Sequence, residues 1–281
     1  MPWIVAVVGA NVALALGPWF IQLAETGPLA SAFWRVAIAS PLLLPALLLL
    51  PREQRLPRGA IGPLLIAGQV FAASLAIYCA GIVRTTVINA VLLGNCAVLF
   101  FPLYAMLAER VRPGRAQIAA LVLACLGAAL LLGRSVQLDA ARSLGDLLCL
   151  VAGIVYTAFF VVTARLAGRV APLAAFVWMT VASAPPLLVF TVLSGEPLIA
   201  RDWGPLIASA AVAQVIGQGL LVLTVGRLSP VAVGAGLLIQ PVVGAVIDVA
   251  ANGYRPALAD AAGAVLVAVA VLMATLAPTR R

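Results

Sequence analysis

The sequence predicts an all-α integral membrane protein with ten transmembrane helices, and its composition carries most of that prediction. Hydrophobic residues make up 64% of the 281 residues and charged residues only 9%, whereas a soluble domain is about half apolar and a quarter charged. The mean hydropathy is +1.18. Apolar runs of roughly 20 residues, the length that crosses a bilayer, recur between short clusters of Gly, Pro and charged residues.

Residue types that the sequence lacks exclude several chemistries. Without His there is no imidazole base, no Ser-His-Asp triad and no His metal site. All 17 basic residues are Arg, and without Lys the chain has no Walker A loop. We therefore predict no catalytic residue, no metal site and no cofactor. The four cysteines show no metal-ligand spacing and are expected to be small buried apolar residues: Cys79, Cys96, Cys125 and Cys149.

Charge and turn clusters divide the chain into ten candidate spans. In order, they cover residues 3–22, 29–50, 60–82, 86–107, 116–133, 144–164, 172–193, 205–226, 230–251 and 257–277. The separators combine Pro or Gly, which end helices, with charges, which stay in water. The clearest separators read Glu-Thr-Gly-Pro at 25–28, Pro-Arg-Glu-Gln-Arg-Leu-Pro at 51–57, Glu-Arg-Val-Arg-Pro-Gly-Arg at 109–115 and Asn-Gly-Tyr-Arg-Pro at 252–256.

If the chain crosses the membrane ten times, its Arg residues are distributed unequally between the two sides of the membrane. Eleven of the 17 lie on the side of the N-terminus and five on the other, and Arg35 lies inside the second span. By the positive-inside rule, both termini face the cytoplasm, as an even number of spans requires. We predict a multi-pass protein of the cell membrane, the inner membrane in a bacterium. The net charge of +8 does not indicate a nucleic-acid partner, because these Arg residues lie in short loops between apolar runs.

The sequence repeats itself at an offset of 144 residues. Residues 28–44 and 172–188 share seven identities in 17 positions, among them two Pro and one Trp. A weaker similarity at offset 145 pairs Asn95 with Gln240. Each half therefore holds five spans, and because five is odd the second half crosses the membrane in the opposite direction.

We accordingly predict two inverted five-helix repeats, residues 1–140 and 141–281. Inverted repeats recur in secondary transporters, which hold the substrate near the middle of the membrane between the two halves. A duplicated membrane scaffold that transports nothing is the alternative.

Short motifs occur in order along the whole chain. The second span contains Phe33-Trp34-Arg35, and the fourth span ends in Leu107-Ala108-Glu109-Arg110, followed by Gln117. The sixth span opens with Gly145-Asp146-Leu147-Leu148 and continues with Tyr156-Thr157, and Arg165 follows the span. In this order and at five-plus-five spacing, they resemble the drug/metabolite transporter superfamily in its ten-span EamA-type branch. The resemblance implies an exporter of small metabolites such as amino acids, not an enzyme. Where many relatives have Glu-Pro in the ninth span, this chain has Gln240-Pro241.

Uncharged polar side chains gather near the midpoints of six spans, where polar groups are costly. They are Asn11, Gln69, Asn95, Tyr156, Gln214 and Gln240, and Gln218 lies one turn from Gln214. We interpret the set as the wall of a substrate cavity. The alternative is interhelical hydrogen bonding, worth on average about 0.6 kcal/mol for each bond.

The middle parts of the fifth and tenth spans lack such residues. Residues 118–133 and 261–274 contain neither an amide nor a charge. The fifth span instead carries small residues four positions apart, at Ala120, Ala124 and Ala128. This pattern is typical of helix packing, so we expect these two spans to serve packing or the contact of a homodimer.

Arg35 is the one basic residue inside a predicted span, about two turns from its outer end. Its repeat partner is Met179, so the charge breaks the symmetry of the halves. A guanidinium matches a carboxylate bidentately, and we predict that Arg35 binds a substrate carboxylate. Snorkelling to the interface and an ion pair with Glu25 are the alternatives.

The positions of two aromatic residues and of the carboxylates can also be predicted from the sequence. Tyr78 and Trp178 lie deep enough to line the cavity, although ordinary packing explains them as well. We expect Asp146 to cap the helix that it opens. Asp248 lies near the outer end of the ninth span, where it could titrate, although an interfacial position explains it as well. Because the carboxylates lie away from the span midpoints, proton antiport, exchange and facilitated diffusion stay open.

The sequence thus predicts a transporter that moves a small, uncharged or zwitterionic molecule by alternating access within the lipid bilayer. Two alternatives come from other classes. One is an intramembrane enzyme that acts on lipid-linked substrates, which would need a buried nucleophile or an acid–base cluster. The other is a scaffold without transport activity, which the central amides disfavour.

Overall fold

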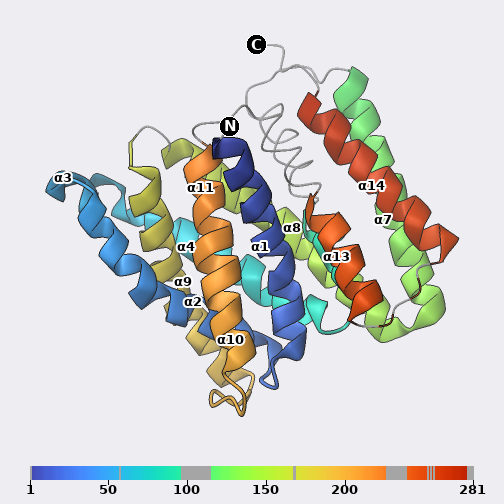
Figure 1. Ribbon diagram of the computed structural model, residues 1–281, viewed down its shortest axis with the longest axis horizontal. Helices are drawn as coiled ribbons and strands as arrows, with labels where there is room; N and C mark the ends of the chain where they lie inside the picture. The colour runs from blue at the N-terminus through green and yellow to red at the C-terminus, as the bar shows by residue number, and fades with distance from the viewer. Residues whose placement is uncertain are drawn as a thin grey trace.

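A computed structural model of the chain describes residues 2–56, 58–95, 115–166, 169–225, 239–251, 253, 255 and 257–276. Every regular element in this part of the chain is a helix (Figure 1). The fourth and ninth predicted spans are described only to residue 95 and from residue 239. Cys96 and the motif at 107–110 lie outside the described residues, as does the side chain of Gln117.

The helices follow the predicted spans closely. Their bounds are α1 Pro2–Leu23, α2 Pro28–Leu43, η1 Leu44–Leu49, α3 Arg52–Arg55, η2 Arg58–Ala60, α4 Ile61–Ile82, α5 Val87–Gly94, α7 Arg115–Leu138, α8 Ala140–Leu166, α9 Pro172–Leu193, α10 Gly204–Ala208, η3 Ser209–Gln218, α11 Gly219–Val225, α13 Ile239–Ala250 and α14 Leu258–Leu276. The second span continues beyond α2 as the 3₁₀ helix η1. The change at Leu44 follows from Pro45, which has no N–H and disfavours the α conformation in the residue before it.

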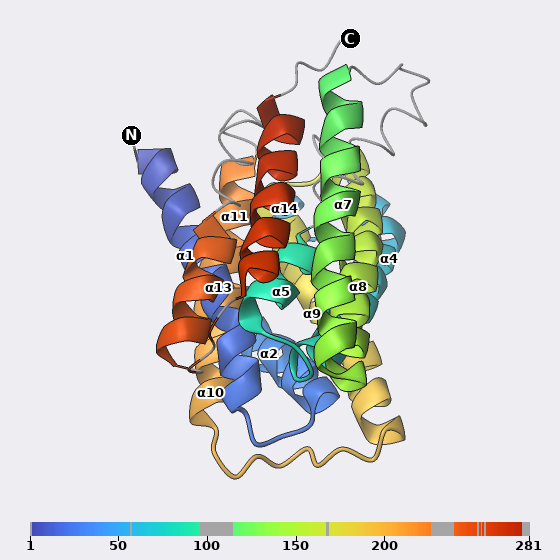
Figure 2. The same ribbon diagram turned by 90° about the vertical axis from the view of Figure 1, so that its right-hand side faces the viewer.

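Five of these helices are long and apolar enough to cross a membrane. They cover Pro28–Leu49, Ile61–Ile82, Ala140–Thr163, Pro172–Leu193 and Gly204–Val222, and shorter apolar helices cover Val8–Leu23, Ile118–Gly127 and Ala261–Ala270. The start of α1 and the end of α14 lie at the same end of the bundle (Figures 1 and 2). With the apolar composition, these helices describe a multi-pass membrane protein.

Helices from the two halves of the chain alternate in the bundle. The helix α4 packs against α8 and α9, and α1 packs against η3 and α13. The helix α2 lies between α9 and η3, and α5 between α8 and α13. The fifth and tenth predicted spans, α7 and α14, pack on each other side by side at one edge of the molecule (Figures 1 and 2).

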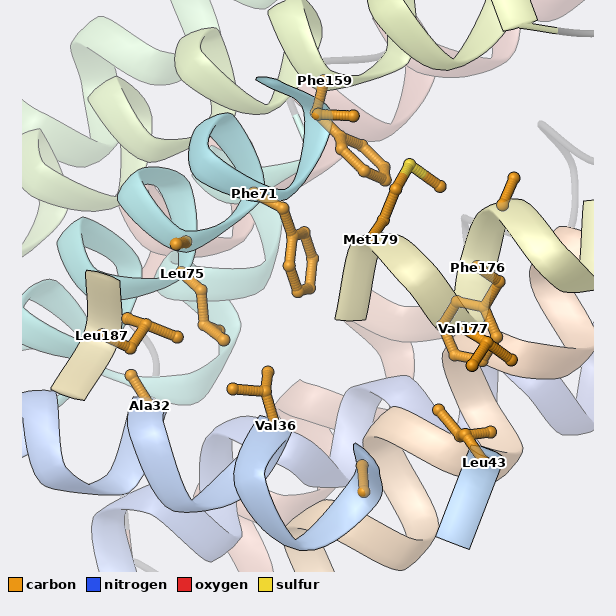
Figure 3. Packing of buried hydrophobic residues seen from close by; sticks show 14 of the residues in the cluster. Ala32, Val36, Leu43, Phe71, Leu75, Phe159, Phe176, Val177, Met179 and Leu187 are labelled. Atoms are coloured by element: carbon orange, nitrogen blue, oxygen red, sulfur yellow. The ribbon is translucent and has the colours of Figure 1, made fainter. Parts of the chain in front are cut away.

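The main hydrophobic core joins α2, α4, α8 and α9. Phe71 of α4 lies between Val36 of α2 and Met179 of α9, with Phe159 of α8 close by (Figure 3). These side chains are buried, and each comes from a different helix. The core therefore holds these four helices together in the middle of the bundle.

Glycines bring α4 and α8 close together. A Cβ atom on Gly81 would lie 2.8 Å from the carbonyl oxygen of Gly145 and 2.8 Å from the Cys149 sulfur. A Cβ atom on Gly145 would lie 2.9 Å from the carbonyl oxygen of Gly81. Further along the pair, the Ser74 hydroxyl donates to the Ala152 carbonyl at 2.9 Å. Small residues permit such close backbone contact in membrane helices.

Three local features differ from the sequence predictions. The helix α8 begins at Ala140, where Asp139 accepts from the Ala141 N–H at 3.2 Å, so Asp146 lies in the second turn and is not the cap. The eighth span, expected as one α-helix, has a ten-residue π-helix, η3, between α10 and α11. Cys79 and Cys149 are buried as expected, but Cys125 is exposed on α7.

The close contact of α4 with α8 predicts that Gly81→Ala lowers the thermal stability of the purified protein. The added Cβ overlaps a carbonyl oxygen and a sulfur atom, and overpacking of this kind costs about 1–3 kcal/mol. The control is Gly62→Ala in the first turn of α4, where a Cβ meets nothing within 4 Å. The midpoint temperature of thermal unfolding in detergent is to be measured for both variants. Equal midpoint temperatures for Gly81→Ala and Gly62→Ala would contradict the close contact of α4 with α8.

Candidate functional site

A cavity of about 120 Å³ lies in the middle of the bundle, bounded by α1, α2, α4, α5, α8 and α13 and by the junction of η3 with α11. This volume has room for about four water molecules, at about 30 Å³ for each. Its polar wall consists of Arg35, Ser74, Tyr78, Asn95, Tyr156, Gln218 and Gln240, and apolar side chains such as Leu14, Phe71, Leu75 and Val91 complete it. The cavity is therefore large enough for a small organic molecule and offers it both polar and apolar contacts.

Arg35 provides the one positive charge in the described wall of the cavity. It lies seven residues into α2, about 10 Å from the helix start, and is only 6% exposed. Its Nε donates to the Gln214 side-chain oxygen at 3.0 Å. Within the described residues, it forms no ion pair with Glu25, which is exposed on the loop after α1. The guanidinium is thus held by a neutral group, and its charge is not cancelled by this contact.

Three side-chain amides form a hydrogen-bonded chain beside the cavity. The Asn95 amide of α5 donates to the Gln240 oxygen at 3.3 Å. The Gln240 amide of α13 in turn donates to the Asn11 oxygen of α1 at 2.6 Å. Asn95 and Gln240 line the cavity, whereas Asn11 is fully buried behind them. The chain connects three helices across the two halves of the sequence.

Aromatic rings form another part of the wall. The Gln218 amide donates to the Tyr156 hydroxyl at 2.9 Å, and both side chains line the cavity. The Tyr156 ring stacks on Phe159 with 5.1 Å between ring centroids. Tyr78 lies against Gly94, where a Cβ atom would come within 2.8 Å of its ring. These rings offer an apolar or aromatic group a flat contact surface.

The structure therefore brings eight of the ten sequence-predicted site residues together. Six line the cavity: Arg35, Tyr78, Asn95, Tyr156, Gln218 and Gln240. Asn11 and Gln214 lie directly behind it, each hydrogen-bonded to a residue of the wall. A role of any of them in binding stays a prediction.

Gln69 and Trp178 lie elsewhere. The Gln69 side chain is exposed and donates to the Ala182 carbonyl at 3.2 Å, on the side of α4 that packs on α9. The Trp178 indole donates to the Arg55 carbonyl at 2.6 Å, beside the loop that joins α2 and α4. Neither residue belongs to the described wall of the cavity.

Small residues of the wall were not found by sequence reasoning. Ser74 donates its hydroxyl to a backbone carbonyl, and a Cβ atom on Gly153 would lie 2.7 Å from the Gly94 carbonyl oxygen. Glycine and serine are common in membrane helices, so their presence gave no signal. Their positions become informative only once the crossings of α4, α5 and α8 are known.

Two buried carboxylates surround the first turn of α5. Asp248 of α13 accepts hydrogen bonds from the first two backbone N–H groups of α5, at 3.1 and 2.7 Å. Asp146 of α8 accepts from the Thr85 hydroxyl and from the Asn89 amide, the latter at 2.9 Å. Asp248 is only 1% exposed, so its carboxylate is enclosed by the protein. Both carboxylates hold the start of a helix whose other end reaches the cavity.

The described wall of the cavity consists of a guanidinium, amides, hydroxyls and apolar groups. No carboxylate and no thiol belongs to the described wall of the cavity. Within the residues that the structure describes, no three His, Cys, Asp or Glu side chains gather where they could hold a metal ion. A guanidinium, amides and aromatic rings can instead hold a small molecule that carries a carboxylate and an apolar group.

A multi-pass helical bundle with a polar cavity midway along its helices has the architecture of a membrane transporter. The chain belongs to the EamA-like transporter family, whose family model matches residues 1–133 and 143–276. The match in two halves agrees with the drug/metabolite transporter superfamily that the sequence motifs resemble, and the family is one of transporters rather than enzymes. A comparison with curated proteins finds no match.

A solved crystal structure, described only as that of a protein, shares the fold. Its TM-score with this chain is 0.68, at 17% sequence identity. The similarity covers 98% of this chain and 96% of the other. At this identity the likeness extends to the fold alone, over nearly the full length of both chains.

The amide chain predicts that Gln240→Leu strongly reduces transport. The substitution removes the acceptor of Asn95 and the donor to Asn11 together, and it replaces an amide of the cavity wall by an alkyl group. Uptake of a panel of amino acids and other small metabolites into proteoliposomes measures the loss. Val265→Leu is the control, because this residue lies exposed on α14 at the edge of the bundle. Normal transport by the Gln240 variant would make the amide chain a structural feature only.

Proposed function

We propose that the protein is a secondary transporter that exports small metabolites, such as amino acids, by alternating access. The observation that carries the proposal is a buried guanidinium facing a polar cavity in the middle of a strongly apolar bundle. Membership in a transporter family supports it, because substrate sites of secondary transporters lie between two halves at this depth. The absence of a Walker A motif from the sequence fits a mechanism without that ATP site.

We further propose ten spans arranged as two inverted repeats, residues 1–140 and 141–281. The packing of the helices supports this, since most of the major contacts have a repeat-related counterpart; the contact of α7 with α8 has none between α14 and α1 among the described residues. The contact of α4 with α8 corresponds to that of η3 with α1, and the contact of α5 with α8 corresponds to that of α13 with α1. The family model also matches the two halves separately.

Two repeat-related tryptophans add support for the inverted arrangement. The Trp34 indole donates to the Leu198 carbonyl at 2.7 Å, and the Trp178 indole donates to the Arg55 carbonyl at 2.6 Å. Each bond joins one half of the chain to a loop of the other half. The two loops are near counterparts at the repeat offset and would lie on opposite sides of the membrane.

Both termini are proposed to face the cytoplasm, in a bacterium on the inner side of its inner membrane. The described ends of the bundle support this, because α1 starts and α14 ends on one side (Figure 2). In the predicted ten-span topology, 11 of the 17 Arg residues of the sequence fall on the side of the N-terminus, which the positive-inside rule assigns to the cytoplasm. Export as the direction of transport rests on the family resemblance.

The two alternative classes receive less support. An intramembrane enzyme would need a nucleophile or an acid–base pair at its substrate site, and the described wall offers amides, tyrosines, a serine bonded to the backbone and one Arg. A scaffold would not need a cavity at the centre of the bundle. Neither alternative is favoured by membership in a family of transporters.

Substitution of Arg35 tests the proposed function. Arg35→Gln should weaken transport of carboxylate-bearing molecules more than transport of their amides or esters, because it removes the charge but keeps a polar side chain. Arg35→Lys keeps the charge but loses the planar fork, and should raise the apparent KM for a carboxylate about tenfold. Counterflow into proteoliposomes, with a panel of small amino acids and their amides, measures both variants.

The matched control is Arg201→Gln, because Arg201 is exposed on the loop before α10. This variant should transport the panel like the unmodified protein. If Arg35→Gln affected carboxylates and amides equally, Arg35 would have a structural role. If the unmodified protein transported no member of the panel, the proposed substrate class would be wrong.

A further inference from the structure

Gln214 lies behind the cavity and touches the one charged group of its described wall. Its side chain is fully buried on the π-helix η3. Its oxygen accepts the Arg35 Nε–H at 3.0 Å, and its amide donates to the Thr180 hydroxyl at 3.4 Å. Thr180, on α9, is only 2% exposed. Three buried side chains from three helices thus form a series of hydrogen bonds in which the guanidinium donates to Gln214 and Gln214 donates to Thr180.

The direction of these bonds fixes how the guanidinium can be used. A guanidinium has five N–H donors in a planar fork, and it can meet a carboxylate either along the edge that includes Nε or end-on through its two terminal nitrogens. Gln214 occupies Nε. The two terminal nitrogens therefore remain for an end-on contact with a ligand in the cavity that Arg35 lines.

The neutral amide has a second consequence for the charge. A Glu or Asp at this position would also accept the Nε–H, but it would neutralise the guanidinium in a site with little water. Gln214 satisfies the donor and leaves the positive charge for a ligand. Thr180 accepts from the amide nitrogen of Gln214, which turns the amide oxygen towards Arg35.

Local backbone features bring these groups together. Gly17 of α1 allows η3 to approach, since a Cβ atom there would lie 2.9 Å from the Ala213 side chain and 3.6 Å from the Arg35 Nη1. Gln214 follows Ala213 within the ten-residue π-helix, a geometry that is rare and frequently found at functional sites. The same π-helix ends at Gln218, which lines the cavity and holds the Tyr156 hydroxyl.

We propose that Gln214 is a positioning residue that presents the end-on edge of the Arg35 guanidinium to a substrate carboxylate and sets the preference for carboxylates over uncharged analogues. This inference rests on the proposed transport function. It differs from the sequence prediction, in which Gln214 itself binds the substrate. Gln214 acts through Arg35, and the substrate contacts Arg35, the amides and the aromatic wall.

The test compares L-leucine with L-leucinamide, because a leucine side chain suits the apolar part of the wall. In Gln214→Glu, the new carboxylate should pair with the Nε edge and cancel the charge. The preference for leucine over leucinamide should then fall about tenfold or more, while the melting temperature in detergent stays close to that of the unmodified protein. Counterflow in proteoliposomes gives the preference, and thermal unfolding gives the stability.

A second variant keeps the test decisive if Gln214→Glu fails to fold. Gln214→Met retains the volume but has no strong acceptor for the Nε–H. It should raise the apparent KM for leucine with little change in the maximum rate, because the guanidinium is no longer held in one orientation. The matched control is Ser209→Ala on the same π-helix, where a buried hydroxyl has no hydrogen-bond partner among the described residues. This control should keep both kinetic parameters.

The outcomes separate this inference from the proposed function. If leucine is preferred, Arg35→Gln removes the preference and the Gln214 variants leave it unchanged, then Gln214 does not position Arg35 and only this inference is overturned. If the unmodified protein handles neither compound, the proposed substrate class fails, and the role of Gln214 fails with it. Loss of the preference in Gln214→Glu at unchanged stability supports the inference.

Discussion

A buried positive charge is the constraint on which the middle of this bundle depends. Arg35 lies about 10 Å along a helix of a membrane protein, where insertion of an Arg costs about 2.5–3.5 kcal/mol. The described structure meets this cost with one neutral amide and a cavity, rather than with a carboxylate. An uncancelled charge in the wall of a cavity is poorly explained by structural needs, and the proposed carboxylate of a substrate would neutralise it.

The hydrogen bonds around the cavity differ in strength from one helix end to another. The three-amide chain through Gln240 joins α1, α5 and α13 by bonds of a type worth on average about 0.6 kcal/mol each. Bonds of this strength can exchange while helices move past one another. At the start of α5, by contrast, two buried carboxylates accept four hydrogen bonds. Charged acceptors bind more strongly than neutral ones, so this end of α5 is the better fixed part. Such a division suits a bundle that opens around a central site.

The sequence predicted well where the described helices begin and end, but not which way their side chains face. The seventh span was predicted at 172–193 and is observed as Pro172–Leu193, because the Pro and Gly clusters that end helices are legible in the sequence. Gln69 and Ser74 lie on the same helix, yet the exposed amide faces the α9 side and the hydroxyl belongs to the cavity wall. In a membrane helix both the lipid-facing and the core-facing sides are apolar, so the periodicity that marks the buried face of a soluble helix is lost.

Contacts between residues that are far apart in the chain could not be predicted from the sequence either. An interfacial position was one explanation for Asp248, since its depth near the end of a span is all that the sequence gives. Its burial follows from the start of α5, 160 residues away, whose N–H groups need an acceptor. The π-helix η3 gave no signal either, because Ala and Gly residues in the eighth span are compatible with several helix types.

The central claim is that the cavity beside Arg35 opens in turn to both sides of the membrane and holds the substrate. A single cysteine at Ser74, with the four native cysteines replaced by Ala, places a small reactive group in the cavity wall. Its modification by a membrane-impermeant thiol reagent is to be measured in right-side-out and in inverted vesicles, with and without L-leucine. The account predicts modification from both sides, slowed by leucine in each case. Modification from one side only, at a rate that leucine does not change, would contradict it.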